Sequence, residues 1–458
     1  MRTKAGLTIL AIAAAAAGGS ATAGAPRPQQ LAQGRDLGAH TLAGNGAGGR
    51  VVVIERDLVP RPSGVDVFTA APGAKFGPAV RLRGDNMPAN SVSAAVGPDG
   101  TVALVGAART FPLPDSRRLR AVVGSPGTPF GKPATISRPG ADEASVAFDS
   151  QGTAMAIWTR DANRGAASYI EESTRPPGGD WSEPTVISYE QRGATEPQVA
   201  FDAAGDALAV WARDGSPEEA LAVAGGQAKR RHARKFKAEI VAARRAGTGT
   251  AFGRPQVVSD PRFDSAEASL SVNSRGQAAI AWVLNTPGDK HFRIGAAFRD
   301  DPGERFGKPR FLTPDGRDSY GTSLALDEHG RALVVWTIVG DRPDMASGAN
   351  QVVAAIRQPG GALDRPVKLS DRHTGFPEMA MSPDGHAVVT WVRESRYGYI
   401  VQARRVTTAG AYGPITQISP RGDADELHAA VADGGSALVT WIGDAHPGRG
   451  LEAAALTR

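Results

Sequence analysis

VAFDSQGTAMAIWTR (residues 146–160) and VAFDAAGDALAVWAR (residues 199–213) are the two clearest copies of a pattern that recurs along the chain. Small and apolar residues alternate on both sides of a short turn, and this period of two predicts a β-hairpin. Asp149 and Asp202 open the turn, where a carboxylate can accept backbone N–H groups, and glycine supplies a positive φ. The pattern therefore predicts two antiparallel strands joined by a tight turn.

Eight copies of this hairpin are spread along the sequence. Their turn glycines are Gly49, Gly100, Gly152, Gly205, Gly276, Gly330, Gly385 and Gly435, separated by 51, 52, 53, 71, 54, 55 and 50 residues. Six residues after the glycine stands a tryptophan in the last six copies: Trp158, Trp211, Trp282, Trp336, Trp391 and Trp441. Glu55 and Gly106 take that position in the first two copies. The constant spacing predicts that the tryptophans pack in the core of equivalent sheets.

A second pair of strands is expected after each hairpin. An apolar stretch such as FRIGAAF (residues 292–298) follows the tryptophan strand, and an aromatic-led segment such as WSEPTVIS (residues 181–188) comes next. Proline is tolerated mainly on sheet edges, so the proline segment is predicted to be the outermost strand. Four short strands in each unit of about 50 residues, with almost no helical periodicity, predict the blade of an all-β propeller.

The copy number predicts eight four-stranded blades, with seven as the alternative. Arg27-Pro28-Gln29 repeats the motif Arg254-Pro255-Gln256, so the chain is expected to open with an outer strand. The last unit, residues 427–458, has only three strands. The N-terminal strand is therefore predicted to complete the last blade and to close the ring, within one domain that spans residues 24–458.

The N-terminus has the pattern of an export signal. Arg2 and Lys4 precede an apolar stretch over residues 5–19, and Ala21-Thr22-Ala23 offers a small-residue cleavage site. The apolar stretch is too short to favour a stable membrane span. We therefore expect a signal peptide over residues 1–23 and a secreted or extracytoplasmic protein. The chain has no cysteine, which excludes disulfides, thiolate chemistry and a cysteine-linked lipid anchor.

The mature chain resembles the secreted bacterial proteins that are built from tandem propeller repeats. Its glycine-to-tryptophan hairpin is similar to the repeat motifs of kelch, WD40 and sialidase-type propellers. It lacks the regular double glycine of kelch blades and the Trp-Asp ending of WD40 blades. Phe292-Arg293-Ile294-Gly295 is similar to the F/Y-R-I-P motif of sialidases, with glycine in the place of proline. The resemblance implies the propeller architecture.

Acidic and basic residues recur on one predicted face of the ring. The loops between blades and the loops after each tryptophan share this face, and their variation predicts that it binds a ligand. Glutamate stands nine residues before the turn glycine at Glu143, Glu196, Glu267 and Glu426, and arginine follows the tryptophan strand at Arg160, Arg213 and Arg393. One interpretation is a repeated cross-strand ion pair, and the other is a ring of carboxylates that binds a cation or a sugar.

The longest interval contains a basic insertion at about residues 214–237. Its basic residues are Lys229, Arg230, Arg231, Arg234, Lys235 and Lys237. They form either a solvated loop or a docking patch for a polyanion such as an acidic envelope polymer. No aromatic residues are interleaved for base stacking, so nucleic acid is not an expected partner.

The sequence favours a non-catalytic extracellular binding scaffold that recognises a protein or a glycan through its variable face. The alternative is a glycan-active hydrolase or lyase that uses carboxylates at the mouth of the ring, since paired carboxylates are common in glycosidases. No spacing typical of a nucleophile, a phosphate loop or a metal site is present, so no catalytic residue, metal or cofactor is predicted. We expect a monomer.

Overall fold

The repeated hairpins build eight separate sheets in a computed structural model of the chain. The structure describes residues 27–456, except 57–63, 85–86, 109–116, 162–167, 189–192, 215–237, 248, 286–290, 314–316, 341–349, 397, 421, 423 and 446–447. These described residues form eight four-stranded antiparallel sheets, which we number as blades 1 to 8 in chain order. The prediction of eight blades is confirmed, and the seven-blade alternative is excluded.

Blades 1 to 4 follow one another along the first half of the chain. Blade 1 consists of β2 (Leu37–Gly44), β3 (Arg50–Arg56), β4 (Gly64–Ala70) and β5 (Val80–Arg83). Blade 2 consists of β6 (Asn90–Val96), β7 (Val102–Ala107), β8 (Leu119–Gly124) and β9 (Ala134–Thr135). Blade 3 consists of β10 (Ala141–Phe148), β11 (Ala154–Asp161), β12 (Ser168–Arg175) and β13 (Thr185–Val186). Blade 4 consists of β14 (Ala194–Phe201), β15 (Ala207–Asp214), β16 (Ala238–Arg245) and β17 (Gln256–Val257).

Blades 5 to 8 complete the ring. Blade 5 consists of β18 (Asp264–Val272), β19 (Ala278–Asn285), β20 (Phe292–Arg299) and β21 (Arg310–Phe311). Blade 6 consists of β22 (Ser319–Leu326), β23 (Ala332–Ile338), β24 (Gln351–Arg357) and β25 (Val367–Lys368). Blade 7 consists of β26 (Thr374–Met381), β27 (Ala387–Ser395), β28 (Gly398–Val406) and β29 (Tyr412–Gln417). Blade 8 consists of β30 (Ala424–Val431), β31 (Ala437–Ala445), β32 (Gly448–Leu456) and β1 (Gln29–Gly34).

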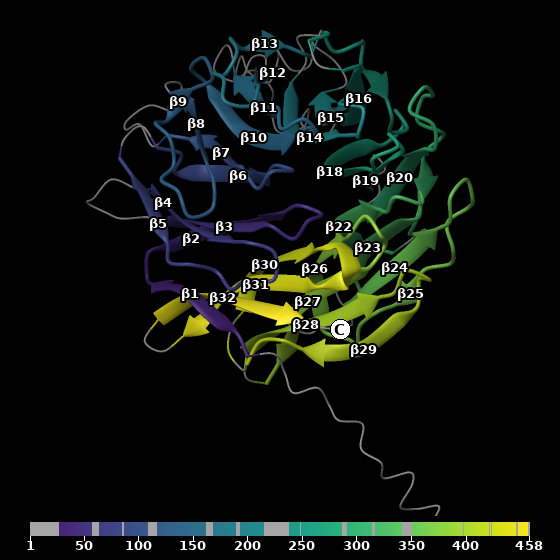
Figure 1. Cartoon of the computed structure of the whole chain (residues 1–458). Coiled ribbons are helices and arrows are strands. Elements are labelled where there is room, and N and C mark those ends of the chain that lie inside the picture. The colour runs from purple at the N-terminus through teal and green to yellow at the C-terminus, as the bar shows by residue number, and fades with distance from the viewer. Residues whose placement is uncertain are drawn as a thin grey trace, which may run out of the picture.

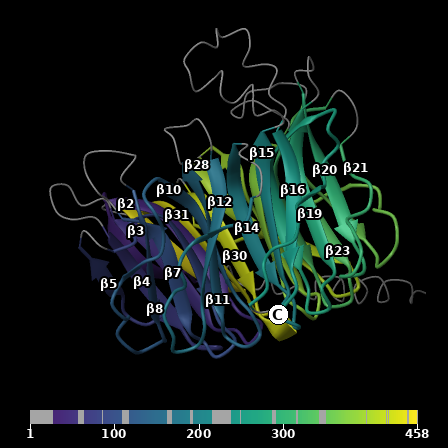
Figure 2. The same cartoon turned by 90° about the horizontal axis from the view of Figure 1, so that it is seen from above.

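The first strand of every blade faces the centre of the ring, and the short proline-led strand lies at the rim (Figure 1). Contacts between β10 and β14, β22 and β26, and β26 and β30 show that the first strands are neighbours around the axis. Viewed from above, the blades stand side by side with their strands running in similar directions (Figure 2). The predicted outermost position of the proline-led strand is thereby confirmed. Among the described residues, no helix is long and apolar enough to span a bilayer.

The chain closes the ring by pairing its two ends. β1 pairs antiparallel with β32, and Gln29 lies opposite Ala453 in that ladder. The N-terminal strand is therefore the outer strand of blade 8, as the repeat of the Arg-Pro-Gln motif predicted. Blade 8 is therefore assembled from both ends of the described chain, and this pairing closes the ring.

The turn of the hairpin forms as its residues predict. In blade 3, Gly152 has a φ of +81°, and the Asp149 carboxylate accepts the backbone N–H of Thr153 at 2.8 Å. Blade 1 corrects one detail of the prediction. Its positive-φ glycine is Gly48, with a φ of +89°, rather than Gly49, because Gly48 is the fourth residue of the five-residue turn, as Gly152 is in blade 3.

The tryptophans fill the interfaces between blades. Trp158 packs in one apolar cluster with Val105 and Leu119 of the preceding blade, and Trp336 does the same with Ile294 and Val283. All six tryptophans of the repeat are buried, which confirms their predicted core role. Each blade therefore depends on its neighbour for its own core, and the ring is the smallest unit that buries every interface.

Gly295 has a steric role at one of these interfaces. It lies directly opposite Trp282 in the pairing of β19 with β20. A Cβ atom at this position would lie 2.8 Å from the Trp282 ring, which is closer than carbon atoms pack. The likeness of residues 292–295 to the sialidase motif thus has a structural explanation in this chain, since the glycine makes room for the indole.

We predict that Trp336→Ala lowers the free energy of unfolding by about 3–5 kcal/mol, because truncation of a buried aromatic leaves a cavity between blades 5 and 6. Equilibrium urea denaturation followed by circular dichroism measures the change. Phe292→Ala is the control, since Phe292 is 47% exposed and its truncation should change stability by less than about 0.5 kcal/mol. Equal losses in the two variants would contradict an interface role for the tryptophan.

Candidate functional site

Every first strand carries a β-bulge opposite the tryptophan position. In blade 3, Asp142 pairs with Thr159 and Ser145 pairs with Ile157, so two residues of β10 lie opposite Trp158. The first bulge residue has a φ of 48–59° in blades 2 to 8, in the order Ser91, Glu143, Glu196, Glu267, Gly321, Phe376 and Glu426. A bulge re-aims the side chains near it, and here it does so at the end of the first strand that bears the variable loops. The four predicted glutamates therefore lie inside the first strand, at the bulge, and not in the preceding loop.

Two of the bulge glutamates link one blade to the next. The Glu143 carboxylate accepts the backbone N–H of Glu196 at 3.0 Å and the hydroxyl of Thr159 at 3.0 Å. The Glu196 carboxylate in turn accepts the backbone N–H of Glu267 at 2.8 Å. These carboxylates thus satisfy backbone donors that the bulge removes from the ladder, and they join blades 3, 4 and 5.

The predicted pairing of these glutamates with arginine is corrected by the structure. Arg160 contacts Glu171 at 3.2 Å, and Arg213 contacts Glu239 at 3.0 Å. Both partners lie on the third strand of the blade, directly across from the second. The arginines therefore form ion pairs across strands two and three, whereas Glu143 and Glu196 turn toward the next blade.

The other predicted site residues have separate places. Arg393 lies 3.7 Å from Asp371, and Glu426 lines a cavity that is described below. The basic residues Lys229, Arg230, Arg231, Arg234, Lys235 and Lys237 lie outside the described residues, as does the predicted signal peptide. A role of the seven face residues and of the basic segment in ligand binding stays a prediction. Among the described residues, no group of three or more acidic or histidine side chains is arranged to hold a metal ion.

The repeat symmetry breaks at the position that follows the bulge. From blade 1 to blade 8 this position is occupied by His40, Ser93, Ser145, Gln198, Ser269, Ser323, Glu378 and His428. In blades 2, 3 and 4 its side chain binds the next blade, as where the Ser145 hydroxyl accepts the backbone N–H of Val199 at 3.3 Å. Blades 7, 8 and 1 are consecutive around the ring and carry ionisable side chains instead. This departure from the repeat marks the candidate site.

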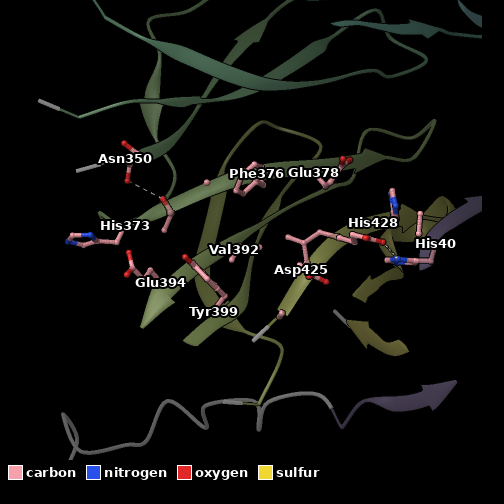
Figure 3. Close-up of a pocket in the computed structure, with 16 residues that line it drawn as sticks. His40, Asn350, His373, Phe376, Glu378, Val392, Glu394, Tyr399, Asp425 and His428 are labelled. Atoms are coloured by element: carbon pink, nitrogen blue, oxygen red, sulfur yellow. Dashed lines mark hydrogen bonds and ion pairs between the residues drawn. The ribbon is translucent and has the colours of Figure 1, made fainter. Parts of the chain in front are cut away.

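A cavity of about 610 Å³ lies at this break. It is lined by residues 373–376, 378, 424–428 and 39–40 of the first strands and their loops, and by Asn350, Val392, Glu394 and Tyr399. Figure 3 shows His40 and His428 side by side at one end, His373, Asn350 and Glu394 at the other, and Phe376 on the strand between them. The volume falls in the range of about 300–1,000 Å³ that is typical of small-molecule sites.

The two histidines form one contact across blades 8 and 1. Their rings meet edge to face with centroids 4.7 Å apart. His40 is buried, with its Nε2 atom 3.0 Å from the Thr440 hydroxyl and its Nδ1 atom 3.7 Å from a Glu426 carboxylate oxygen. Burial, together with the neighbouring His40, lowers the pKa of His428 to about 4, so this ring is neutral at pH 7. The His40 ring beside Glu426 also keeps the pKa of that carboxyl below its ordinary value.

Carboxylates in different environments surround the cavity. Burial raises the pKa of Glu378 to about 7, so this group can either donate or accept a proton near neutral pH. Asp425 is held by Arg449, whose Nη2 atom lies 2.6 Å from both carboxylate oxygens. One oxygen of Glu394, Oε2, is buried and has no hydrogen-bond partner among the described residues. The site therefore combines a neutral histidine, a proton-exchanging acid and an unsatisfied acceptor.

Two exposed aromatic side chains complete the site. Phe376 is 51% exposed and Tyr399 is 36% exposed, although both types usually bury most of their surface. Phe376 occupies the bulge position that glutamate occupies in four other blades, and its ring lies 5.9 Å from that of Tyr320. Exposed aromatic faces beside polar groups are typical of a binding site rather than of a core.

Sequence reasoning missed the residues that depart from the repeat: His40, Phe376, Glu378, Glu394, Tyr399 and His428. The two histidines give no local signal, because His40 and His428 are far apart in the chain. An alignment of the eight hairpins at the tryptophan contained the signal, since Glu378 and His428 stand where four other blades have serine. The bulge hid this signal, because it shifts the register of the first strand against the second.

Comparisons with known proteins identify the fold but no family. The chain matches no protein-family model, and no curated protein matches it. Among solved structures it is similar to the BP39L lectin from Burkholderia pseudomallei, with a TM-score of 0.54 and 11% identity, over 85% of this chain and 100% of that chain. It is also similar to an ulvan lyase of polysaccharide lyase family PL25, with a TM-score of 0.50 and 10% identity, over 93% of this chain and 95% of that chain. At these identities the likeness shows a common propeller fold.

We predict that Glu196→Ala lowers the free energy of unfolding by about 1 kcal/mol, because the Glu267 N–H loses its acceptor. Glu267→Ala is the matched control, since Glu267 occupies the same bulge position with the same φ of 55°. No hydrogen bond links its carboxylate to a neighbouring blade among the described residues. Thermal denaturation of the two variants makes the comparison, and equal losses would contradict the blade-linking role.

We predict that Glu378→Gln changes how stability depends on pH. The Glu378 carboxyl loses its proton near pH 4.5 in the unfolded chain and near pH 7 in the folded chain. Its contribution to the free energy of unfolding is therefore fully present below pH 4.5 and is lost as the pH rises to about 7. Glutamine does not ionise, so the variant should gain stability relative to the wild type between about pH 5 and about pH 8. Urea denaturation across this range measures the difference.

His428→Gln is the control, because its effect on stability should depend on pH in the opposite direction. The pKa of His428 is about 4 in the folded chain against 6.5 in the unfolded chain, so its stability is complete above pH 6.5 and is lost as the pH falls toward 4. This variant should therefore gain stability relative to the wild type only on the acid side. A pH-independent difference for Glu378→Gln would show that its carboxyl is not held in a buried environment.

Proposed function

We propose that the protein binds a carbohydrate in the cavity between blades 7, 8 and 1. The observation that carries the proposal is the break of the repeat, which brings two histidines, a buried glutamate and two exposed aromatic rings into one cavity. In blades 2, 3 and 4 the corresponding side chains bond the next blade, as with Ser93 and the N–H of Val146. On three consecutive blades, the side chains of Glu378, His428 and His40 line the cavity instead.

The side chains of the cavity suit a polyhydroxylated ligand. A sugar hydroxyl both donates and accepts hydrogen bonds, and histidine, asparagine and carboxyl groups together supply both kinds of partner. Phe376 and Tyr399 offer apolar faces on which a sugar ring can lie. Pockets that combine aromatic walls with a few polar groups are typical of small-ligand sites. The likeness to a lectin and to a polysaccharide lyase supports the proposal by analogy of fold.

The second candidate function is hydrolysis of a glycosidic bond at the same cavity. Glu378 favours it, because a carboxyl with a pKa of about 7 can protonate a leaving-group oxygen near neutral pH. The carboxylates of Asp425 and Glu426, on the next blade, would then activate water or act as the nucleophile. Glu196 is less suited to this role, because its carboxylate already accepts the backbone N–H of Glu267 on the next blade.

We predict that Phe376→Ala and Tyr399→Ala each weaken carbohydrate binding by about tenfold or more, which corresponds to about 1.4 kcal/mol. A glycan array identifies a ligand, and isothermal titration calorimetry measures its affinity. Phe292→Ala is the matched control, because Phe292 occupies in blade 5 the ladder position that Tyr399 occupies in blade 7. Equal effects of Tyr399→Ala and Phe292→Ala, or an array without binding, would overturn the proposed function.

The same panel of glycans decides between binding and hydrolysis. Release of reducing ends by the wild-type protein, its loss in Glu378→Gln and unchanged ligand affinity in that variant would establish the hydrolase. Binding without release of products supports the binding function alone.

A further inference from the structure

We propose that the carbohydrate ligand carries a protonated amine, as an amino sugar with a free amino group does. This inference rests on the proposed carbohydrate site and names the class of its ligand. The structure supports it through the charge of the lining residues, through an unsatisfied carboxylate oxygen and through the aromatic faces beside that oxygen.

Among the described residues, the cavity is lined by acids and by no arginine or lysine side chain. Its carboxyl groups are those of Glu378, Glu394, Asp425 and Glu426. Arg449 lies outside the lining and pairs with Asp425, and His40 contacts Glu426. Glu378 and Glu394 have no such cationic partner among the described residues. An acidic ligand would place a further negative charge among these groups, so uronic and sialic acids are disfavoured.

The carboxylate of Glu394 indicates that the ligand carries a hydrogen-bond donor. Its Oε2 atom is buried, and no described residue donates a hydrogen bond to it, although its backbone N–H bonds the His373 carbonyl at 2.9 Å. A buried polar atom without a partner costs free energy, and the cost is greater for a charged group. A ligand N–H that carries a positive charge is the strongest partner for a carboxylate, since charge-assisted hydrogen bonds exceed neutral ones.

The aromatic rings favour the same class of ligand. Tyr399 lies directly opposite Glu394 in the pairing of β27 with β28, and Figure 3 shows both at the same end of the cavity. A cation within about 6 Å of an aromatic face is attracted by the negative centre of the ring. Glu394 and Tyr399 thus combine, on one pair of neighbouring strands, the two kinds of group that hold an ammonium.

The equivalent positions of other blades show that this arrangement is particular to blade 7. Asn285 and Phe292 occupy these positions in blade 5, where an amide replaces the carboxylate. Asp161 and Ser168 occupy them in blade 3, where no aromatic ring is present. Blade 5 also shows that the fold accepts an amide at this position, so Glu394→Gln should fold.

The test compares oligomers of glucosamine with the N-acetylated oligomers of the same length. At about pH 6 the free amine is protonated, whereas the acetylated nitrogen carries no charge. We expect the glucosamine oligomer to bind at least about tenfold more tightly by calorimetry. Raising the salt from about 50 mM to about 500 mM should weaken its binding and leave that of the acetylated oligomer nearly unchanged.

Glu394→Gln identifies the group that recognises the amine. We expect this variant to lose about tenfold in affinity for the glucosamine oligomer and to keep its affinity for the acetylated oligomer. Asp161→Asn, the matched change in blade 3, should leave both affinities unchanged. Circular dichroism of both variants establishes that they are folded, and the salt dependence of the wild type tests the inference without any substitution.

The outcomes separate this inference from the proposed function. If the acetylated oligomer binds equally or more tightly, and Phe376→Ala loses affinity as expected, the preference for an amine is wrong. The proposed carbohydrate site would still be supported. Absence of binding to any glycan would overturn both. A salt-insensitive preference for the amine that survives Glu394→Gln would overturn the role of this carboxylate.

Discussion

The structure depends on one β-bulge in each blade. At this bulge, two residues of the first strand lie opposite a single residue of the second strand. The tryptophan fills the interface with the preceding blade, and the bulge facing it releases backbone N–H groups from the ladder. The carboxylates of Glu143 and Glu196 accept such groups on the next blade. One local irregularity thus serves both the packing of the blades and their polar connection, and its repetition holds the ring together.

The candidate site uses the same irregularity for another purpose. In blades where the residues at and after the bulge form hydrogen bonds with the next blade, these residues have a structural role. In blades 7, 8 and 1 these positions carry Phe376, Glu378, His428 and His40, and the cavity opens among them. Two of these blades meet where the chain closes on itself, since β1 completes blade 8 and His40 follows on β2. The site is therefore assembled from both ends of the described chain.

The electrostatics of the cavity follow from burial. Removing Glu378 from water raises its pKa, and removing His428 from water lowers its pKa. Between pH 4.5 and pH 6.5, where both side chains would otherwise be mostly charged, burial therefore favours the neutral form of each. Such a pair can exchange hydrogen-bonding roles with a ligand. The sequence could predict neither shift, because both depend on burial in the folded ring, and His428 also has His40 from the other end of the chain as its neighbour.

The sequence alone determined the blade, the number of blades and the strand that closes the ring, because these follow from a local period of two and from a spacing that repeats. It also predicted that the tryptophans are buried. Only the tertiary structure decided which side chains meet. Arg160 pairs with Glu171 rather than Glu143, since the bulge turns the first strand away and the third strand lies directly opposite. The cavity likewise depends on the curvature of the ring, which brings residues 40 and 428 into contact.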